Sequence, residues 1–324
     1  MTKALALMSG GLDSMLAARL VDSLNVDVIC ISFTSPFFDA RRAQAAAQYL
    51  NLPLIIEDIT GEFLKMFKAP RYGYGKGMNP CIDCHTLMLN IAGRKMAAHG
   101  ADFIITGEVL GQRPMSQTRQ SLNIVAKNSG YADYIIRPLS AQLLLPTKAE
   151  REGKIDRSRF LSISGRGRKE QMRLAEDFGI TQYPPPAGGC LLTDPMFAKR
   201  LRELFSYTAN PEIRDYHLLK HGRHFRLPDG TKIIVGRNNQ DNEGLRNLAT
   251  ENDLLCYVAD FPGPLVLVPN GGSDSARLIA AKLCLRYSDA PKDAEAAIVC
   301  RQYQQHSSLI TGAADIKECP VSII

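Results

Sequence analysis

Three cysteines occur in surroundings that favour chemistry over packing. Cys81 and Cys84 form a Cys-x-x-Cys pair within the segment NPCIDCH, and Cys190 closes the segment PAGGC. Cys-x-x-Cys spacing lets two thiolates approach one metal ion or cluster. A third thiol in a Gly-Gly loop suits an iron–sulfur cluster that has three protein ligands and one open iron. The spacing also leaves open a redox pair, or a zinc site that uses His85 as a further ligand.

The other cysteines have the setting of core residues. Cys30 lies within an expected strand, and Cys256, Cys284 and Cys300 lie in apolar runs. A free cysteine of this kind behaves as a small hydrophobic residue, so we expect all four to be buried. Cys319 lies near the end of the sequence and indicates nothing on its own.

A second candidate site is the segment Ser9–Ser14, which reads SGGLDS and follows an expected strand at 4–8. Gly10 and Gly11 allow a tight turn whose backbone N–H groups point inward, and the serines at both ends add hydroxyl donors. The N-terminal end of the following helix attracts anions to the same point. Asp13 would be out of place beside phosphate without a divalent cation, so we predict that it binds magnesium.

The segment Ser9–Ser14 resembles the SGGxDS signature of the PP-loop, or N-type ATP pyrophosphatase, families. The Gly-Lys-Ser/Thr ending of the Walker loop is missing. The resemblance implies that ATP is cleaved to AMP and pyrophosphate and that the AMP passes to a substrate oxygen. GMP synthetase, NAD synthetase, argininosuccinate synthetase and tRNA-modifying enzymes all carry this motif, so it does not identify the substrate.

Longer segments resemble the tRNA 4-thiouridine synthase family, and the cysteine motifs are also similar to those of tRNA 2-thiouridylases. These segments lie between residues 3 and 205. Each is a weak indicator alone, and together they are specific for the family. The resemblance implies that the carbonyl oxygen of a tRNA uridine is adenylated and then displaced by sulfur. The segments are NPCIDCH, TGEVLGQRPMSQT at Thr106–Thr118, SGRGRKEQMRLAEDFGI at Ser164–Ile180, and YPPPAGGCLLTDPMFAKRL at Tyr183–Leu201.

The same resemblance implies cofactors and a sulfur donor. Cys81, Cys84 and Cys190 would hold a 4Fe–4S cluster, or a persulfide would pass between Cys84 and Cys190. Relatives with all three cysteines resemble the cluster-using branch, so we expect the cluster, together with ATP and Mg²⁺. Cys84, Cys190 and Asp13 are the expected catalytic residues. Sulfur would come from sulfide or from a persulfide carrier such as a cysteine desulfurase.

Other residues are expected around ATP and RNA. Ligands of open α/β sheets bind at the carboxyl ends of the strands, which is where Phe33 and Gly107 lie. Gly107 would admit the adenine or ribose closely, and Phe33 is either an adenine contact or a core residue. The candidate nucleotide-binding residues are Ser9, Gly10, Gly11, Asp13, Ser14, Phe33, Gly107 and Gln112. The candidate RNA-binding residues are Arg113, Arg166, Arg168, Lys169 and Arg237.

The net charge of +6 is unevenly distributed. The stretch from Lys148 to Arg173 contains nine basic and four acidic residues, a net charge of +5. A local excess of this kind suits a polyanionic partner such as tRNA, although a solvated, charge-mixed surface is the alternative. Arg166, Arg168 and Lys169 are candidates for contact with tRNA or with pyrophosphate.

The first half of the sequence alternates short apolar runs with helical stretches. This alternation predicts βαβ units and an α/β fold with a doubly wound parallel sheet. The expected strands lie at 4–8, 26–33, 54–56 and 103–106, and the expected helices include 40–50 and 87–98.

Prolines and glycines at 183–189 cannot continue a helix or a central strand, so they end the α/β domain. We therefore expect a PP-loop ATP pyrophosphatase domain at 1–195, a helical linker at 196–222 and a smaller α+β domain at 223–324.

The segment His224–Leu254 resembles the NFACT-R domain, a suspected RNA-binding module of ribosome-quality-control proteins. Asp229-Gly230 between two alternating runs predicts a hairpin, and the GRNN segment that starts at Gly236 carries the core of the match. Arg237 and its neighbouring asparagines would contact a phosphate backbone without reading sequence. A plain loop is the alternative, and the tryptophan and histidine expected after Asp253 are absent.

The composition is that of an ordinary globular protein, with 45% hydrophobic and 22% charged residues among 324. No segment approaches the ~20 apolar residues of a membrane helix, and the first residues lack a signal-peptide pattern. We therefore expect a cytoplasmic protein with no membrane partner. We also expect it to lack the THUMP and rhodanese-like modules of 4-thiouridine synthases. The alternative functions are adenylation of a small molecule by a PP-loop enzyme and non-catalytic RNA binding.

Overall fold

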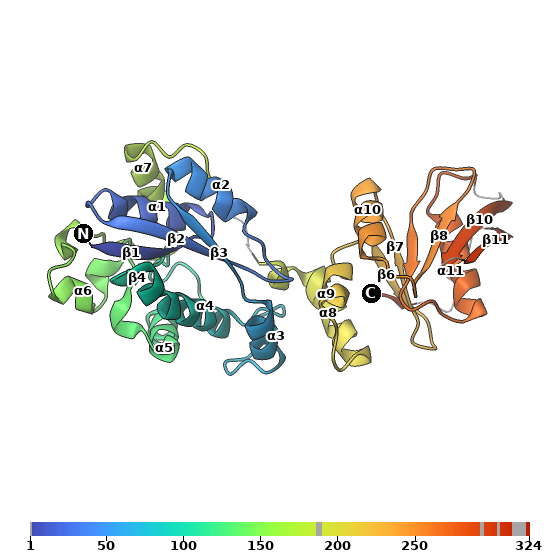
Figure 1. The fold of residues 1–324 in the computed structure, drawn as a ribbon, viewed down its shortest axis with the longest axis horizontal. Helices are drawn as coiled ribbons and strands as arrows, with labels where there is room; N and C mark the ends of the chain where they lie inside the picture. Colours follow the sequence, from blue (N-terminus) through green and yellow to red (C-terminus); the bar gives the residue numbers. More distant parts are fainter. Residues whose placement is uncertain (1, 186–189, 292–294, 303–304, 313–321) are drawn as a thin grey trace. The chain divides into compact units, whose positions relative to one another are not determined.

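The computed structural model describes residues 2–185, 190–291, 295–302, 305–312 and 322–324. The chain divides into two compact units, Met1–Thr193 and Asp194–Ile324 (Figure 1). The first boundary lies two residues from the expected one, and the helices expected as a linker belong to the second unit. Within the described residues, no helix is long and apolar enough to cross a membrane.

Unit 1 is built around a five-stranded sheet with the order β3-β2-β1-β4-β5. All of its strand pairs are parallel, which confirms the predicted α/β fold. The order reverses between β1 and β4, and ligands of such sheets bind at this switch point. The strands are β1 Lys3–Leu7, β2 Asp27–Thr34, β3 Leu54–Asp58, β4 Phe103–Ile105 and β5 Ile135–Ile136.

Helices cover both faces of this sheet, as a buried parallel sheet requires. Helices α1, α2 and α7 lie on one face, and α4 and α5 lie on the other (Figure 1). The core beneath α1 includes Ala4 and Leu16, which are both 0% exposed. The helices are α1 Leu12–Asp22, α2 Arg41–Leu50, α3 Thr60–Lys68, α4 Cys81–Met96, α5 Arg119–Ser129, α6 Lys148–Arg151 and α7 Lys169–Asp177.

Helix α4 begins six residues earlier than the expected helix at 87–98. Its first turn contains Cys81 and Cys84, and Pro80 is its N-cap residue. The polar residues Asp83 and His85 obscure the apolar periodicity here, so the sequence pattern revealed only the later, more apolar turns. The cysteine pair therefore lies on a helix rather than in a loop.

Unit 2 is a seven-stranded antiparallel sheet with helices on both faces, which confirms the predicted smaller α+β domain. Its order is β11-β10-β8-β9-β7-β6-β12. The predicted hairpin around Asp229-Gly230 joins β6 to β7. The strands are β6 Arg223–Arg226, β7 Lys232–Val235, β8 Leu254–Val258, β9 Val266–Val268, β10 Glu295–Gln302, β11 Gln305–Gly312 and β12 Ser322–Ile323.

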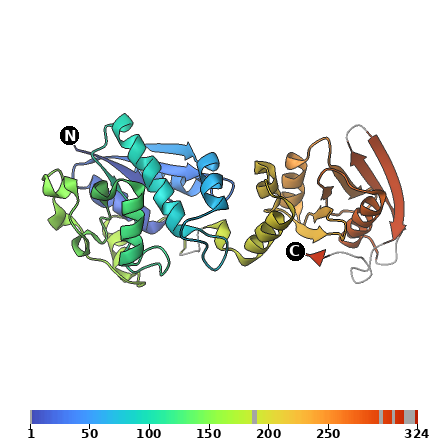
Figure 2. The same ribbon diagram turned by 90° about the horizontal axis from the view of Figure 1, so that it is seen from below.

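Helix α11 (Asp274–Arg286) covers one face of the second sheet (Figure 2). Helices α9 (Ile213–Leu218) and α10 (Asn239–Leu248) contribute Leu218 and Leu245 to a smaller apolar cluster on β7 and β9. Helix α8 (Pro195–Tyr207) begins after the N-cap residue Asp194. The expected core cysteines Cys256, Cys284 and Cys300 of this unit are buried, as is Cys30 of unit 1.

Candidate functional site

The segment Ser9–Ser14, named here the phosphate loop for its expected ligand, follows β1 and leads into α1, as the sequence predicted. Gly10 has φ +76°, and a Cβ atom there would lie 2.4 Å from the backbone carbonyl of Arg42. Only glycine tolerates this combination of dihedral angle and close contact. Ser9 Oγ donates to Ser14 Oγ over 3.2 Å, and Gly11 N donates to Ser9 Oγ over 3.3 Å. These contacts hold the loop in a tight turn.

Asp13, in the first turn of α1, has two carboxylate oxygens in different surroundings. Oδ2 accepts a hydrogen bond from Gln112 Nε2 at 2.8 Å. Oδ1 is buried and has no hydrogen-bond partner among the described residues. A buried carboxylate oxygen without a partner is costly, and carboxylate oxygen is the ligand type that Mg²⁺ prefers. The chemistry of this oxygen fits the predicted magnesium ion.

Gly107 brings the end of β4 against the phosphate loop. A Cβ atom at Gly107 would lie 2.5 Å from the backbone carbon of Asp13 and 2.5 Å from the nitrogen of Ser14. The glycine is therefore required for close packing of the segment after β4 against the first turn of α1, whether or not it also admits the nucleotide. Phe33, at the end of β2, is 6% exposed, so most of its ring is already buried in protein.

Two loops bring Cys190 toward the Cys-x-x-Cys pair. Met78 N, three residues before Cys81, donates to Leu192 O at 2.9 Å, and Thr193 N donates to Cys190 O at 2.9 Å. Leu192 is 1% exposed and anchors the second loop. The segments 75–80 and 190–193 are thus joined by their backbones, despite the long separation in sequence.

The three thiols lie close enough to influence one another. Burial raises the pKa of Cys84 well above its usual value, and the sulfur atoms of Cys190 and Cys81 raise it further. Burial also raises the pKa of Cys190 to about 11, although the Leu192 backbone N–H and the Arg113 guanidinium oppose this. Arg113 therefore lies near the cysteines. Asn79 Nδ2 donates to Cys81 Sγ at 3.0 Å.

The chemistry of the three thiols bears on which group they would hold. Among the described residues, no three histidine, cysteine, aspartate or glutamate side chains form a group that could hold a single metal ion. Cysteine thiolates are ligands of both zinc and iron–sulfur clusters, so the donor set of the trio fits either group.

A buried polar network, which the sequence analysis missed, connects the cysteines to the sheet. His85, which follows Cys84, contacts Glu108 Oε1 through Nδ1 at 2.7 Å, and Arg137 Nε donates to Glu108 Oε2 at 2.8 Å. Burial raises the pKa of Glu108, but Arg137 and then His85 more than offset this and lower it to about 2. The only sequence signal for this network was a charged residue, Arg137, directly after the apolar Ile135–Ile136.

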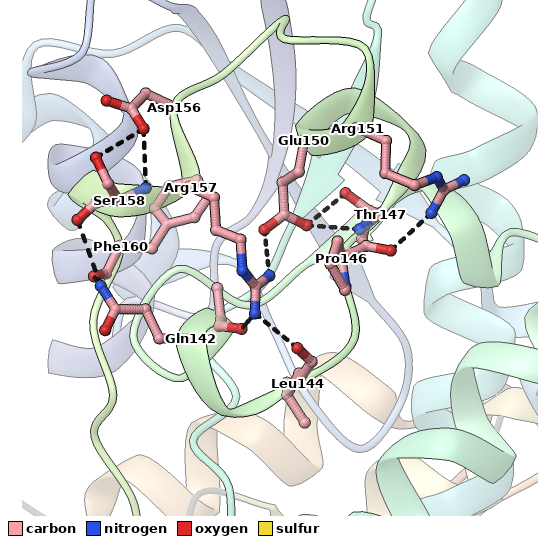
Figure 3. Close-up of polar contacts among 11 residues, drawn as sticks. Gln142, Leu144, Pro146, Thr147, Glu150, Arg151, Asp156, Arg157, Ser158 and Phe160 are labelled. Atoms are coloured by element: carbon pink, nitrogen blue, oxygen red, sulfur yellow. Dashed lines mark hydrogen bonds and ion pairs between the residues drawn. The ribbon is translucent and has the colours of Figure 1, made fainter.

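The basic stretch divides into paired and unpaired halves. Its first four cations each form an ion pair, as Arg157 does with Glu150 at 2.6 Å (Figure 3). Arg157 also donates to the carbonyl oxygens of Ala141 and Leu144, so its role is to hold this loop together. The other three pairs are Lys148–Glu152, Arg151–Asp133 and Lys154–Asp102.

The later cations of the stretch make no ion pair among the described residues. They are Arg159, Arg166, Arg168, Lys169 and Arg173. The loop that carries Arg166 and Arg168 is fixed beside the β4 end, because Gly165 N donates to Leu110 O at 2.7 Å. The candidate cations Arg166, Arg168 and Lys169 therefore lie next to the loop that contains Gln112 and Arg113.

The GRNN segment of unit 2 has clear structural roles. Arg237 Nε donates to Asp241 at 2.6 Å, and Asn238 caps α10 by accepting from Asp241 N at 2.9 Å. Asn242 Oδ1 accepts from Leu265 N at 2.9 Å. The Arg237 side chain remains 44% exposed, so part of its guanidinium is accessible.

Comparison with known proteins found a match for each of the two units. Residues 1–142 match the family model described as Thiamine biosynthesis protein (ThiI), and residues 222–319 match that of the NFACT protein RNA binding domain. A probable tRNA sulfurtransferase of Alkaliphilus oremlandii is 34% identical over 146 residues, which are 43% of this chain and 36% of that protein. The tRNA-specific 2-thiouridylase MnmA of Helicobacter hepaticus is 31% identical over 163 residues, 44% of this chain and 47% of that protein.

A solved 4-thiouridine synthetase–RNA complex with bound ATP is 20% identical, covers 68% of this chain and 52% of its own, and has a TM-score of 0.35. This chain spans less than half the length of the two curated relatives. The family and sequence matches confirm the resemblances inferred from the motifs. Unit 1 is similar to the tRNA sulfurtransferases, and unit 2 is similar to the NFACT-type domain.

Proposed function

We propose that this chain is an ATP-dependent enzyme that adenylates the carbonyl oxygen of a tRNA uridine and then replaces that oxygen with sulfur. One continuous set of contacts carries the proposal. Asp13 packs against Gly107, the next residue Glu108 bonds to His85, and His85 follows Cys84. A nucleotide-activating loop and a sulfur site therefore flank the end of one strand.

The phosphate loop performs the first half of the reaction. Its N–H groups and the N-terminus of α1 would bind the ATP phosphates, and Asp13 would hold a Mg²⁺ ion, which when bound would neutralise their charge. The uridine oxygen attacks the α-phosphate, a bond forms between them, and pyrophosphate leaves. Fixed donors for the pyrophosphate lower the barrier because they stabilise charge that develops in the transition state.

The cysteine loops perform the second half. Adenylation converts a poor leaving group into AMP, so a sulfur nucleophile can form the C–S bond while the C–O bond breaks. We propose that Cys81, Cys84 and Cys190 hold a 4Fe–4S cluster, which when bound would supply an open iron for sulfide. The contacts that bring Cys190 toward the Cys-x-x-Cys pair support this over a persulfide, which needs only Cys84 and Cys190.

The tRNA would be held by cations of unit 1 and by unit 2. Arg113, Arg166, Arg168 and Lys169 lie near the β4 end, and Arg237 is an exposed contact candidate in the NFACT-type domain. The sulfur donor would be sulfide or a persulfide carrier such as a cysteine desulfurase. A cytoplasmic location follows from the proposed substrate.

The direct test combines anaerobically purified protein, unmodified tRNA transcript, MgATP and sulfide, followed by mass spectrometry of the nucleosides. We expect a thiouridine in the tRNA, together with AMP and pyrophosphate. Asp13→Asn should abolish pyrophosphate release, because it removes the charge that binds Mg²⁺. Cys81→Ser, Cys84→Ser and Cys190→Ser should each lose bound iron and thiouridine.

Cys256→Ser is the matched control. Cys256 lies in the core of unit 2, so this variant should have unchanged iron content. Pyrophosphate release that needs a small molecule instead of tRNA would contradict the proposal. Stoichiometric zinc in place of iron would contradict the proposed 4Fe–4S cluster.

A further inference from the structure

Two glutamine side chains connect Asp13 to helix α7. Gln112 Nε2 donates to Asp13 Oδ2 at 2.8 Å, and Gln171 Nε2 donates to Gln112 Oε1 at 3.3 Å. Gln171 is 0% exposed and lies in the first turn of α7, which packs against α1. Asp13 and a helix more than 150 residues away in sequence are thus connected through two side-chain amides.

The direction of these bonds fixes the orientation of the Gln112 amide. A glutamine amide has a donor end and an acceptor end. Because the Asp13 carboxylate only accepts, the Gln112 NH₂ group faces it and the Gln112 oxygen faces Gln171. The oxygen of Gln171 is itself buried without a partner among the described residues. The hydrogen bond from Gln171 therefore adds support to the orientation in which Gln112 donates to Asp13.

The bond from Gln112 also leaves the other oxygen of Asp13 available. Oδ2 is occupied, whereas Oδ1 is buried without a partner among the described residues. Groups that hold a metal ligand in place commonly change metal affinity strongly when they are mutated. We infer that Gln112 and Gln171 form a positioning relay that presents Asp13 Oδ1 to the divalent cation of the bound nucleotide.

This relay rests on the nucleotide site of the proposed function but requires neither RNA nor sulfur. The test therefore measures metal binding directly. Mn²⁺ serves as a paramagnetic probe in place of Mg²⁺, and α,β-methylene-ATP replaces ATP because the bond that would be cleaved is blocked. Free Mn²⁺ is followed by electron paramagnetic resonance as the full-length chain is titrated.

Methionine has a similar length to glutamine and cannot make these hydrogen bonds. Gln112→Met should weaken Mn²⁺ binding by about tenfold or more, and Gln171→Met by about threefold, because it acts through Gln112. The double variant should bind Mn²⁺ like Gln112→Met alone, since the effect of Gln171 passes through Gln112. Gln171→Glu gives a second variant, which places an acceptor against the Gln112 oxygen and should weaken binding more than Gln171→Met.

Gln142→Met is the matched control. Gln142 donates to the backbone oxygen of Phe160 (Figure 3) and takes no part in the relay, so its loss should leave Mn²⁺ binding unchanged. Wild-type affinity in Gln171→Met and Gln171→Glu, or additive effects in the double variant, would overturn the relay. Failure of the wild-type chain to bind Mn²⁺ with the nucleotide would overturn both relay and nucleotide site. Weakened Mn²⁺ binding in the variants without any thiolation by the wild type would support the relay and contradict the proposed function.

Discussion

Glu108 lies between the phosphate loop and the cysteine pair, because it follows Gly107 in the chain and contacts His85. One oxygen of its carboxylate contacts Arg137 and the other contacts His85. Both Glu108 and Arg137 are 6% exposed. Two buried charges stabilise a fold only while both are present, because removing one leaves the other without compensation. The position of His85, and with it the first turn of α4, depends on this carboxylate.

Replacing Glu108 with glutamine should therefore lower the free energy of unfolding by roughly 3 kcal/mol near neutral pH. The folded-state pKa is lowered from 4.5 to about 2, so the stabilisation by Glu108 is fully present above about pH 4.5. It is lost as the pH falls toward 2. The difference between wild type and Glu108→Gln, measured by urea unfolding at several pH values, should shrink over that range.

Glu62→Gln is the control for this measurement. Glu62 pairs with Arg94 on the surface, where the side chains are 52% and 49% exposed. Exposed pairs of this kind contribute little, so the control should be near wild-type stability. A Glu108→Gln deficit that stays constant from pH 5 to 3 would show that charge pairing is not what Glu108 provides.

The sequence predicted the residues with strong local motifs, such as Asp13 and the Cys-x-x-Cys pair. It missed Glu108, His85 as its partner, and Gln171. Glu108 and Gln171 find their partners only when segments far apart in sequence fold together, and a single sequence carries no signal for such pairs. Gln112 was expected beside the nucleotide, whereas its contact with Asp13 could only be seen in the fold.

At the scale of elements, the loop after β4 and the loop before α7 form one surface beside the phosphate loop. A bridge between Leu110 and Ser164 joins them. On this surface Arg113, Arg166, Arg168 and Lys169 make no ion pair with any residue that the structure describes, while the earlier part of the basic stretch is neutralised by its ion pairs. The net charge of the stretch alone did not distinguish these halves.

We expect the two halves to differ in their contribution to tRNA binding. Changing Arg166, Arg168 and Lys169 together to glutamine should weaken tRNA binding and lower the slope of log K against log salt by roughly two to three, because fewer counterions are released. Binding is measured at several salt concentrations.

The control removes the same number of positive charges from the paired half, by changing Lys148, Arg151 and Lys154 to glutamine. Since these cations already neutralise carboxylates, the control should change the salt slope much less. Equal changes in both triple variants would mean that tRNA responds only to net charge and does not contact the α7 loop.

Element types were predicted better than element boundaries. The four strands expected in unit 1 lie within about two residues of their expected positions, because buried parallel strands are continuous apolar runs. The two-residue strand β5 was not expected. The start of α4 was placed six residues late, since its first turn carries the polar and cysteine residues of the site. In unit 2 the hairpin at Asp229-Gly230 was predicted from its turn, but β10 and β11 were not, because no turn motif of that kind marks them.

At the scale of the whole molecule, the two units have separate cores and are proposed to have separate roles in catalysis and in RNA binding. Unit 1 contains the phosphate loop, the cysteines and the relay, and its relatives include tRNA sulfurtransferases. Unit 2 matches an RNA-binding domain model, and most of its GRNN segment serves capping and loop contacts. The proposed chemistry therefore depends on unit 1, and unit 2 is proposed to supply RNA affinity.

The fate of the uridine oxygen tests the central claim most directly. The reaction is run in H₂¹⁸O with unlabelled tRNA, MgATP and sulfide, and the AMP and nucleosides are analysed by mass spectrometry. If the uridine oxygen is adenylated and displaced, each thiouridine is accompanied by one AMP that carries no ¹⁸O, because its new oxygen comes from tRNA. AMP that carries ¹⁸O from water, or AMP formed without thiouridine, would contradict the account.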